Sequence, residues 1–203
     1  MNSPRQIALL FIIIFAGVAA YLYFPRYFSQ EAMANQLASL LSGQPKAIDL
    51  RVKSADCQYN GVLPDHKCTP GAIFQNATTG QICVSGYSKT VRQVSTKLRQ
   101  SVFAEYGVYY PQPYGAYEVD HLIPLELGGD NDIANLFPQP AKPAPGFPEK
   151  DIVENYLHEE VCAGNISLNN AQGEIASNWQ EVYNNLTPDQ IAQIKSQYSN
   201  WAK

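Results

Sequence analysis

The strongest hydrophobic pattern lies at the start of the chain, where residues 7–24 read IALLFIIIFAGVAAYLYF. An apolar run of about 18 residues is just long enough to cross a bilayer as a helix. It predicts either a retained membrane anchor or a signal peptide cleaved after the small residues 18–20. We favour the anchor because the run continues past that site, and Arg5 before it favours placing the following chain outside the cytoplasm.

Later segments show helical spacing and recognisable ends. Residues 30–41 predict a short amphipathic helix. Residues 88–107 predict a second helix, with a cap at Ser95 and an end at the glycine in position 107. Two further helices are predicted to begin after Ser167 and Thr187, the latter followed by proline and by a glutamine that completes a capping box.

Residues 149–163 predict a longer helix with two different sides. Its apolar side is formed by Ile152, Val153, Tyr156, Leu157 and Val161. At about 100° per residue, polar side chains fall within roughly 60° of one another on the other side. These are Asp151, Asn155, His158 and Cys162. The pattern therefore predicts a convergent polar face.

An extended pattern precedes that helix. Residues 117–127 (YEVDHLIPLEL) predict a strand, residues 128–131 (GGDN) a turn, and residues 133–137 a returning strand. Residues 47–83 are rich in glycine, proline, asparagine and aspartate and predict loops with brief strands. Strands followed by helices in a chain of 203 residues, 45% of them hydrophobic, predict one α+β domain.

The four cysteines lack the CxxC spacing of common zinc sites. In an exported chain an even number of cysteines favours disulfides, although four cysteines allow three complete pairings. Cys57 and Cys68 bracket one loop and are placed to close it, which leaves Cys83 to meet Cys162. A metal site is the alternative.

Asp120 and His121 are the strongest candidates for catalytic and metal-binding residues. A histidine titrates near neutrality and suits a general base, whereas an aspartate is a hard oxygen ligand for a divalent cation. The formal net charge of −4 does not favour a polyanion as partner, but a bound cation supplies positive charge that the count omits. The alternative is a structural pair at a strand end.

At these residues the sequence resembles a known family. DHLIPLELGGDNDIANL, residues 120–136, is similar to the HNH endonuclease signature, a ββα-metal core with Asp-His on a hairpin. The resemblance continues with gaps from Cys68 to Tyr183, and this longer pattern is similar to exported bacterial HNH-like proteins. It implies an α+β domain with a ββα-metal core and additional helices at 68–203, after an N-terminal anchor or signal segment at 1–26 and a spacer at 27–67.

The resemblance also implies roles for individual residues. His121 matches the general base and Asp120 a metal ligand, while Asn135 matches the asparagine that holds the hairpin loop and orients the base. The proline-rich segment before the helix interrupts the usual spacing, so the last ligand is taken from the helix. We favour His158 over Asn155, and Glu154, nearer the apolar side, is the weaker candidate. Magnesium fits oxygen ligands, and a histidine ligand also admits manganese, nickel or zinc.

The implied function is metal-dependent hydrolysis of phosphodiester bonds, with DNA favoured over RNA as the partner. Lys89 and Arg92 are candidates for phosphate contact. The domain is expected outside the cytoplasm, either anchored by its N-terminal helix or released after cleavage. Two alternatives stay open: a non-catalytic, envelope-associated binding or structural domain, and an exported hydrolase of another phosphodiester.

Overall fold

The computed structural model describes residues 46–47 and 49–198, and in this part of the chain helices accompany two small antiparallel sheets. The α-helices are α3 (Thr79–Ile82), α4 (Tyr87–Val91), α5 (Thr96–Glu105), α6 (Phe147–Cys162), α7 (Leu168–Asn185) and α8 (Pro188–Gln197). The strands are β1 (Lys46–Ala47), β2 (Ala72–Ile73), β3 (Tyr117–His121) and β4 (Leu136–Pro140). The α+β class predicted from the sequence is confirmed.

The predicted anchor at residues 7–24 and the predicted spacer helix at residues 30–41 lie outside the described residues. Among the residues that are described, no helix is both long enough and apolar enough to cross a membrane.

The predicted helix starts after Ser95, Ser167 and Thr187 are confirmed, whereas the residues at the beginning of the segment 88–107 form the separate short helix α4. The side chain of Ser95 caps α5 by accepting a hydrogen bond from the backbone N–H of Leu98 at 3.2 Å. Ser167 caps α7 in the same way, and Thr187 caps α8 within a capping box that has proline at the first helical position. Each cap satisfies a backbone donor that the helix itself leaves free.

The hairpin differs from the prediction in where its strands lie. β3 pairs with β4 in an antiparallel register that joins Glu118 to Gln139 and His121 to Leu136. The prediction that the first strand runs to residue 127 is wrong, because after His121 the chain enters a buried loop. Pro124 has no N–H to donate to a strand partner, and the short 3-10 helices η1 (Leu125–Leu127) and η2 (Ile133–Asn135) follow.

Gly129 lies too close to the preceding backbone for a residue with a side chain. A Cβ at this position would lie 1.8 Å from the carbonyl oxygen of Ile123. The Gly129 backbone N–H donates to the carbonyl of Pro124 at 2.9 Å, and Gly129 forms a β-bridge with Ile73 of β2. Only a residue without a side chain permits this close approach.

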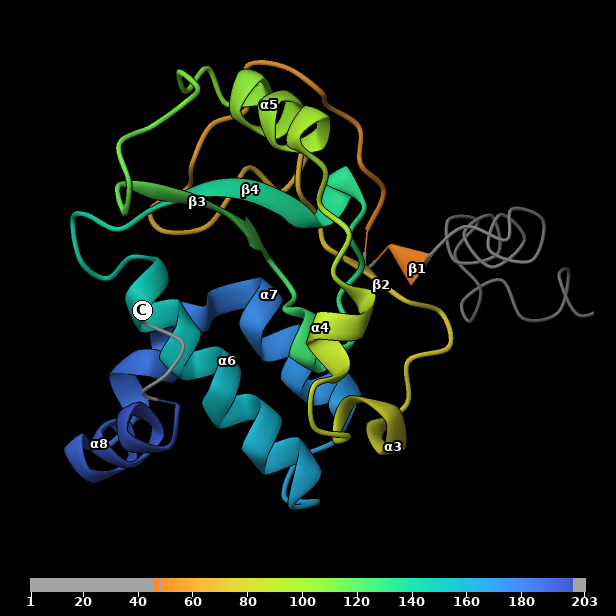
Figure 1. The fold of residues 1–203 in the computed structure, drawn as a ribbon, viewed down its shortest axis with the longest axis vertical. Coiled ribbons are helices and arrows are strands. Elements are labelled where there is room, and N and C mark those ends of the chain that lie inside the picture. Colours follow the sequence, from red (N-terminus) through yellow and green to blue (C-terminus); the bar gives the residue numbers. More distant parts are fainter. Residues whose placement is uncertain (1–45, 48, 199–203) are drawn as a thin grey trace, which may run out of the picture. The chain divides into compact units, whose positions relative to one another are not determined.

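Two groups of helices flank the hairpin. Figure 1 shows α5 on one side of β3 and β4, and α6 and α7 on the other. The α5 side buries Val102 and Phe103 against the hairpin. The larger cluster, which joins α6 and α7 to the loop after His121, contains Ile82, Ile123, Leu127, Val153, Leu157, Val161, Ala171, Ile175 and Trp179. The loop that follows the Asp120–His121 pair is therefore part of the core.

Both predicted disulfides are present. Cys57 is bonded to Cys68, and Cys83 at the end of α3 is bonded to Cys162 in the last turn of α6. Their sequence separations are 11 and 79 residues. Two disulfides fit an extracellular or otherwise oxidising environment.

Candidate active site

Asp120 and His121, neighbours at the end of β3, make different contacts. The Asp120 carboxylate contacts Lys150 of α6, with Oδ2 and Nζ 2.9 Å apart. The His121 ring contacts Asn131 in the turn before η2, with Nε2 and Oδ1 3.3 Å apart. The pair thus divides into a carboxylate that faces α6 and an imidazole that faces the loop.

Lys150 is the central residue in the contacts around the Asp120 carboxylate. Its side chain is fully buried, and its ammonium group donates to the carbonyl of His121 at 2.7 Å and to the carboxylate of Glu154 one turn further along α6. Burial lowers the pKa of Lys150, but the carboxylates of Asp120 and Glu154 raise it more, so the amine stays charged. This ion pair joins β3 to α6.

Further carboxylates surround this ion pair. Burial and the neighbouring charges of Asp120 and Asp151 raise the pKa of Glu118 to about 9. Desolvation by the surrounding protein and the charge of Asp120 raise the pKa of Asp151 to about 7, and burial raises the pKa of Glu154 well above its ordinary range. Burial and the mutual repulsion of these carboxylates therefore favour their protonated, uncharged forms.

His121 is 97% buried, with 3% of its surface exposed. Burial lowers its pKa to about 4, although the charge of Asp120 opposes the shift. The imidazole is therefore neutral at pH 7 and able to accept a proton.

Asn135 fixes the loop that follows His121. Its side-chain amide accepts from the backbone N–H of Ile123 and donates to the carbonyls of Ile123 and Asp130, each at 2.9 Å. Its own carbonyl accepts from the N–H of Leu122 at 2.8 Å. Since Asn135 is fully buried, these bonds replace strand pairing in the segment next to the candidate base.

The predicted helix ligands have other contacts. His158 lies at the far end of α6, where Nε2 is 3.1 Å from the carbonyl oxygen of Ile82 and 3.5 Å from Cys162 Sγ. Asn155 is buried and donates to the carbonyl of Asp151 within the same helix, at 2.7 Å. The structure records no contact from either side chain to Asp120.

A second group of candidate metal ligands lies around His158. The ligand atoms of Cys83, His158 and Cys162 all fall within 4.8 Å of one another. Both sulfurs are already joined in a disulfide, so this group is free to hold a metal ion only after reduction. It is chemically separate from the carboxylate cluster.

Of the two predicted phosphate contacts, Arg92 is the better placed. Arg92 and Lys89 are both exposed, at the end of α4 and within it. The charge of Arg92 acts on His121, Glu118 and Asp151, and it contributes to lowering the pKa of each. Arg92 therefore borders the cluster at the surface, where Asp151 is also exposed.

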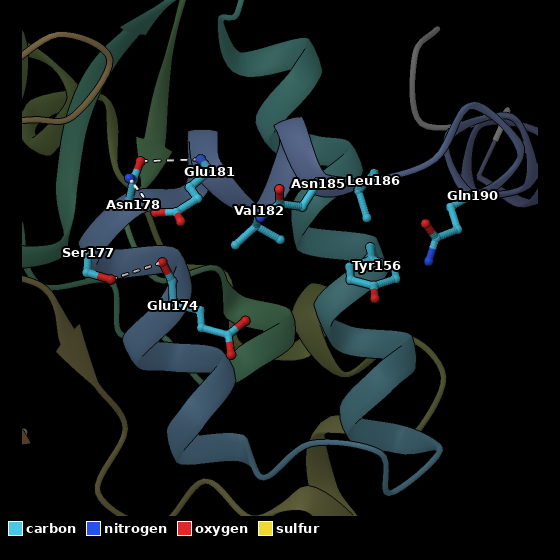
Figure 2. A pocket seen from close by; sticks show the side chains of 9 residues that line it. All are labelled: Tyr156, Glu174, Ser177, Asn178, Glu181, Val182, Asn185, Leu186 and Gln190. Carbon is cyan, nitrogen blue, oxygen red and sulfur yellow. Dashed lines mark hydrogen bonds between the residues drawn. The ribbon is translucent and has the colours of Figure 1, made fainter.

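Two surface cavities lie away from these residues. Figure 2 shows one of about 470 Å³ between α6, α7 and α8, lined by residues that include Tyr156, Glu174, Asn178 and Gln190. The other, of about 670 Å³, lies between the Cys57–Cys68 loop and α7. Neither is lined by Asp120 or His121, so cavity size does not identify the reactive residues of this chain.

Sequence reasoning missed Lys150 and Asn131 and gave Glu154 little weight. Lys150 and Glu154 are spaced four apart, a spacing typical of exposed helical ion pairs, and nothing in that pattern shows that both face a buried aspartate. Asn131 belongs to the GGDN segment, whose glycine, aspartate and asparagine are common in turns regardless of any distant contact. Their partners are distant in sequence, so no local signal was available for either contact.

Comparisons of this chain with protein-family models, with curated proteins and with solved structures found no match.

Proposed function

We propose that this protein is an HNH-type endonuclease that uses a divalent cation to hydrolyse phosphodiester bonds of DNA outside the cytoplasm. The observation that carries the proposal is a neutral, buried His121 directly after an aspartate that belongs to a carboxylate-rich cluster. Hydrolysis of a phosphodiester needs a base to activate water and positive charge near the phosphate. His121 would serve as the base, and Asp120 beside it at the end of β3 would be a ligand of the cation that supplies the positive charge.

The residues present fit a hard cation. The cluster offers carboxylate oxygens, which magnesium prefers, and its raised pKa values reflect burial first and then repulsion between neighbouring carboxylates, which a bound cation would relieve. Within the described part of the chain, the buried Oε1 atom of Glu126 has no hydrogen-bond partner. Asp120 from β3 and Asp151 or Asn155 from α6 would hold the ion. When bound, it polarises the phosphate and stabilises the departing oxygen.

The protein's own groups have separate tasks in this proposal. His121 takes the proton of the attacking water, and Asn135 keeps the following loop in place. Lys150 orients Asp120 through their ion pair. The exposed Arg92 binds the substrate phosphate.

The test is nicking of supercoiled plasmid DNA by the purified full-length chain, with magnesium and with excess chelator. His121→Ala should reduce magnesium-dependent nicking by at least about 100-fold, because a positioned general base contributes roughly 10²- to 10⁴-fold. His66→Ala is the matched control, since His66 is exposed and pairs with Asp49. Equal nicking by wild type and His121→Ala would disprove the proposal.

One observation favours a non-catalytic binding or structural domain instead. Asp120 is already paired with the buried Lys150, which stabilises the fold without a metal ion. In that case magnesium should not raise the thermal unfolding midpoint, whereas a ligand that binds only the folded state must raise it. Substrate panels containing DNA, RNA and small phosphodiesters then separate an endonuclease from a hydrolase of another phosphodiester.

A further inference from the structure

We infer that Asn131 is a positioning residue that fixes which nitrogen of His121 exchanges the catalytic proton and holds Arg92 beside that base. This inference rests on the proposed function, because it takes His121 to be the catalytic base. Its geometric basis is a single side-chain amide that contacts His121 and both neighbours of Arg92.

The orientation of the Asn131 amide is set by the backbone. Its Oδ1 accepts from the N–H of Gln93 at 3.0 Å, and its Nδ2 donates to the carbonyl of Val91 at 2.8 Å. A backbone N–H only donates and a carbonyl only accepts, so the reversed amide would lose both bonds. The oxygen, not the nitrogen, therefore faces His121.

This orientation decides the tautomer of the imidazole. Oδ1 of Asn131 lies 3.3 Å from Nε2 of His121, and an amide oxygen can only accept. Nε2 must therefore carry a hydrogen, whether the ring is neutral or charged. In the neutral ring Nδ1 is then the nitrogen that keeps its lone pair and can accept a proton.

The Asn131 amide also links His121 to the segment that carries Arg92. Val91 and Gln93 lie immediately before and after Arg92, and Asn131 is bonded to the backbone of both. These contacts span 38 and 40 residues of sequence. They hold the segment between α4 and α5 against the turn that precedes η2, and the charge of Arg92 acts on His121. Asn131 thus links base and phosphate-binding residue without contacting substrate.

The test is a spectrum of the histidine ring nitrogens of the ¹⁵N-labelled full-length chain, without substrate. The chain has three histidines, and His121→Gln identifies the signals of His121 by their loss. The expected result is a ring protonated at Nε2. A ring protonated at Nδ1 in the wild type would overturn the inference, and this reading requires no variant of Asn131 to fold.

Two variants separate positioning from a merely structural role. Asn131→Ala should mix the two tautomers and lower kcat about 10- to 100-fold, the order expected when a reacting group is misplaced by about 1 Å. Asn131→Asp keeps an acceptor for Nε2 and for Gln93, so it should keep the tautomer and recover part of kcat. Asn165→Ala, at an exposed asparagine bonded to Glu160, is the matched control.

The outcomes also separate this inference from the proposed function. The expected tautomer in a chain without nuclease activity would remove the proposed function and retain the positioning of His121. An active nuclease whose His121 spectrum is unchanged in Asn131→Ala would remove the positioning role alone.

Discussion

The two ends of α6 have different chemistry although they belong to one helix. Its first turns carry Lys150 and Glu154, which meet Asp120 of β3 in a buried group of charges. Its last turn carries His158 and Cys162, which meet α3 through a disulfide and a hydrogen bond to a carbonyl. The first end is held by electrostatics and the second by a covalent bond.

This difference shows that a polar helical face is not necessarily one site. At helical spacing Asp151, Asn155, His158 and Cys162 form a continuous face. In the structure, Asp151 faces the charges of the first end, whereas His158 lies beside the disulfide of the second. The first end should therefore respond to pH and cations, and the second to reductants.

The largest loss of stability is expected from removing the disulfide at the last turn of α6. Replacing both Cys83 and Cys162 by alanine opens a loop of 79 residues and should lower the free energy of unfolding by about 4.5 kcal/mol through loop entropy. Replacing both Cys57 and Cys68, which close a loop of 11 residues, should cost about 3 kcal/mol. Urea unfolding of both variants measures the difference, and equal losses would contradict the loop-length argument.

Removing the buried ammonium at the charged end should have a similar effect. Lys150→Met leaves Asp120 and Glu154 buried without their cation and should lower the free energy of unfolding by about 4 kcal/mol. Lys142→Met, at an exposed lysine, is the control. Adding Asp120→Asn and Glu154→Gln to Lys150→Met should restore most of the loss. A loss below about 1 kcal/mol would show that the ion pair does not organise this end.

The stability of the charged end of α6 is also expected to depend on pH. The pKa of Glu118 is raised from 4.5 to about 9, so the folded state binds a proton that the unfolded state has lost between these values. Stability contributed by this group is full below about pH 4.5 and falls as the pH rises towards 9. The urea midpoint of wild type should therefore decline relative to Glu118→Gln over this range. Parallel midpoints would contradict the shift.

The smallest effect is expected from His158→Ala. The variant loses one hydrogen bond to a carbonyl and should be about 1 kcal/mol less stable, with plasmid nicking close to wild type. A 100-fold loss of magnesium-dependent nicking would instead make His158 a ligand of the catalytic metal. That result would mean that both ends of α6 contribute to one site, contrary to the contacts in the structure.

Local patterns predicted where α5, α7 and α8 begin because helix ends depend on nearby residues. Ser95, Ser167 and Thr187 cap helices by bonding to N–H groups three residues away, and these signals are visible in the sequence. The loop after His121 was predicted as strand because its alternation and apolar content resemble one. Its actual path depends on the Asn135 side chain and on contact between Gly129 and β2, which are tertiary interactions.

By itself, the sequence determined the α+β class, the helix caps and the disulfide candidates, and it marked Asp120 and His121 as candidate site residues, since these follow from local spacing and residue chemistry. Only the tertiary structure decided the partners: Lys150 for Asp120, Asn131 for His121 and the disulfide for His158. Burial and hydrogen-bond geometry join residues 10 to 76 positions apart at these sites. Periodicity reports which face a side chain occupies, but not which distant group lies opposite it.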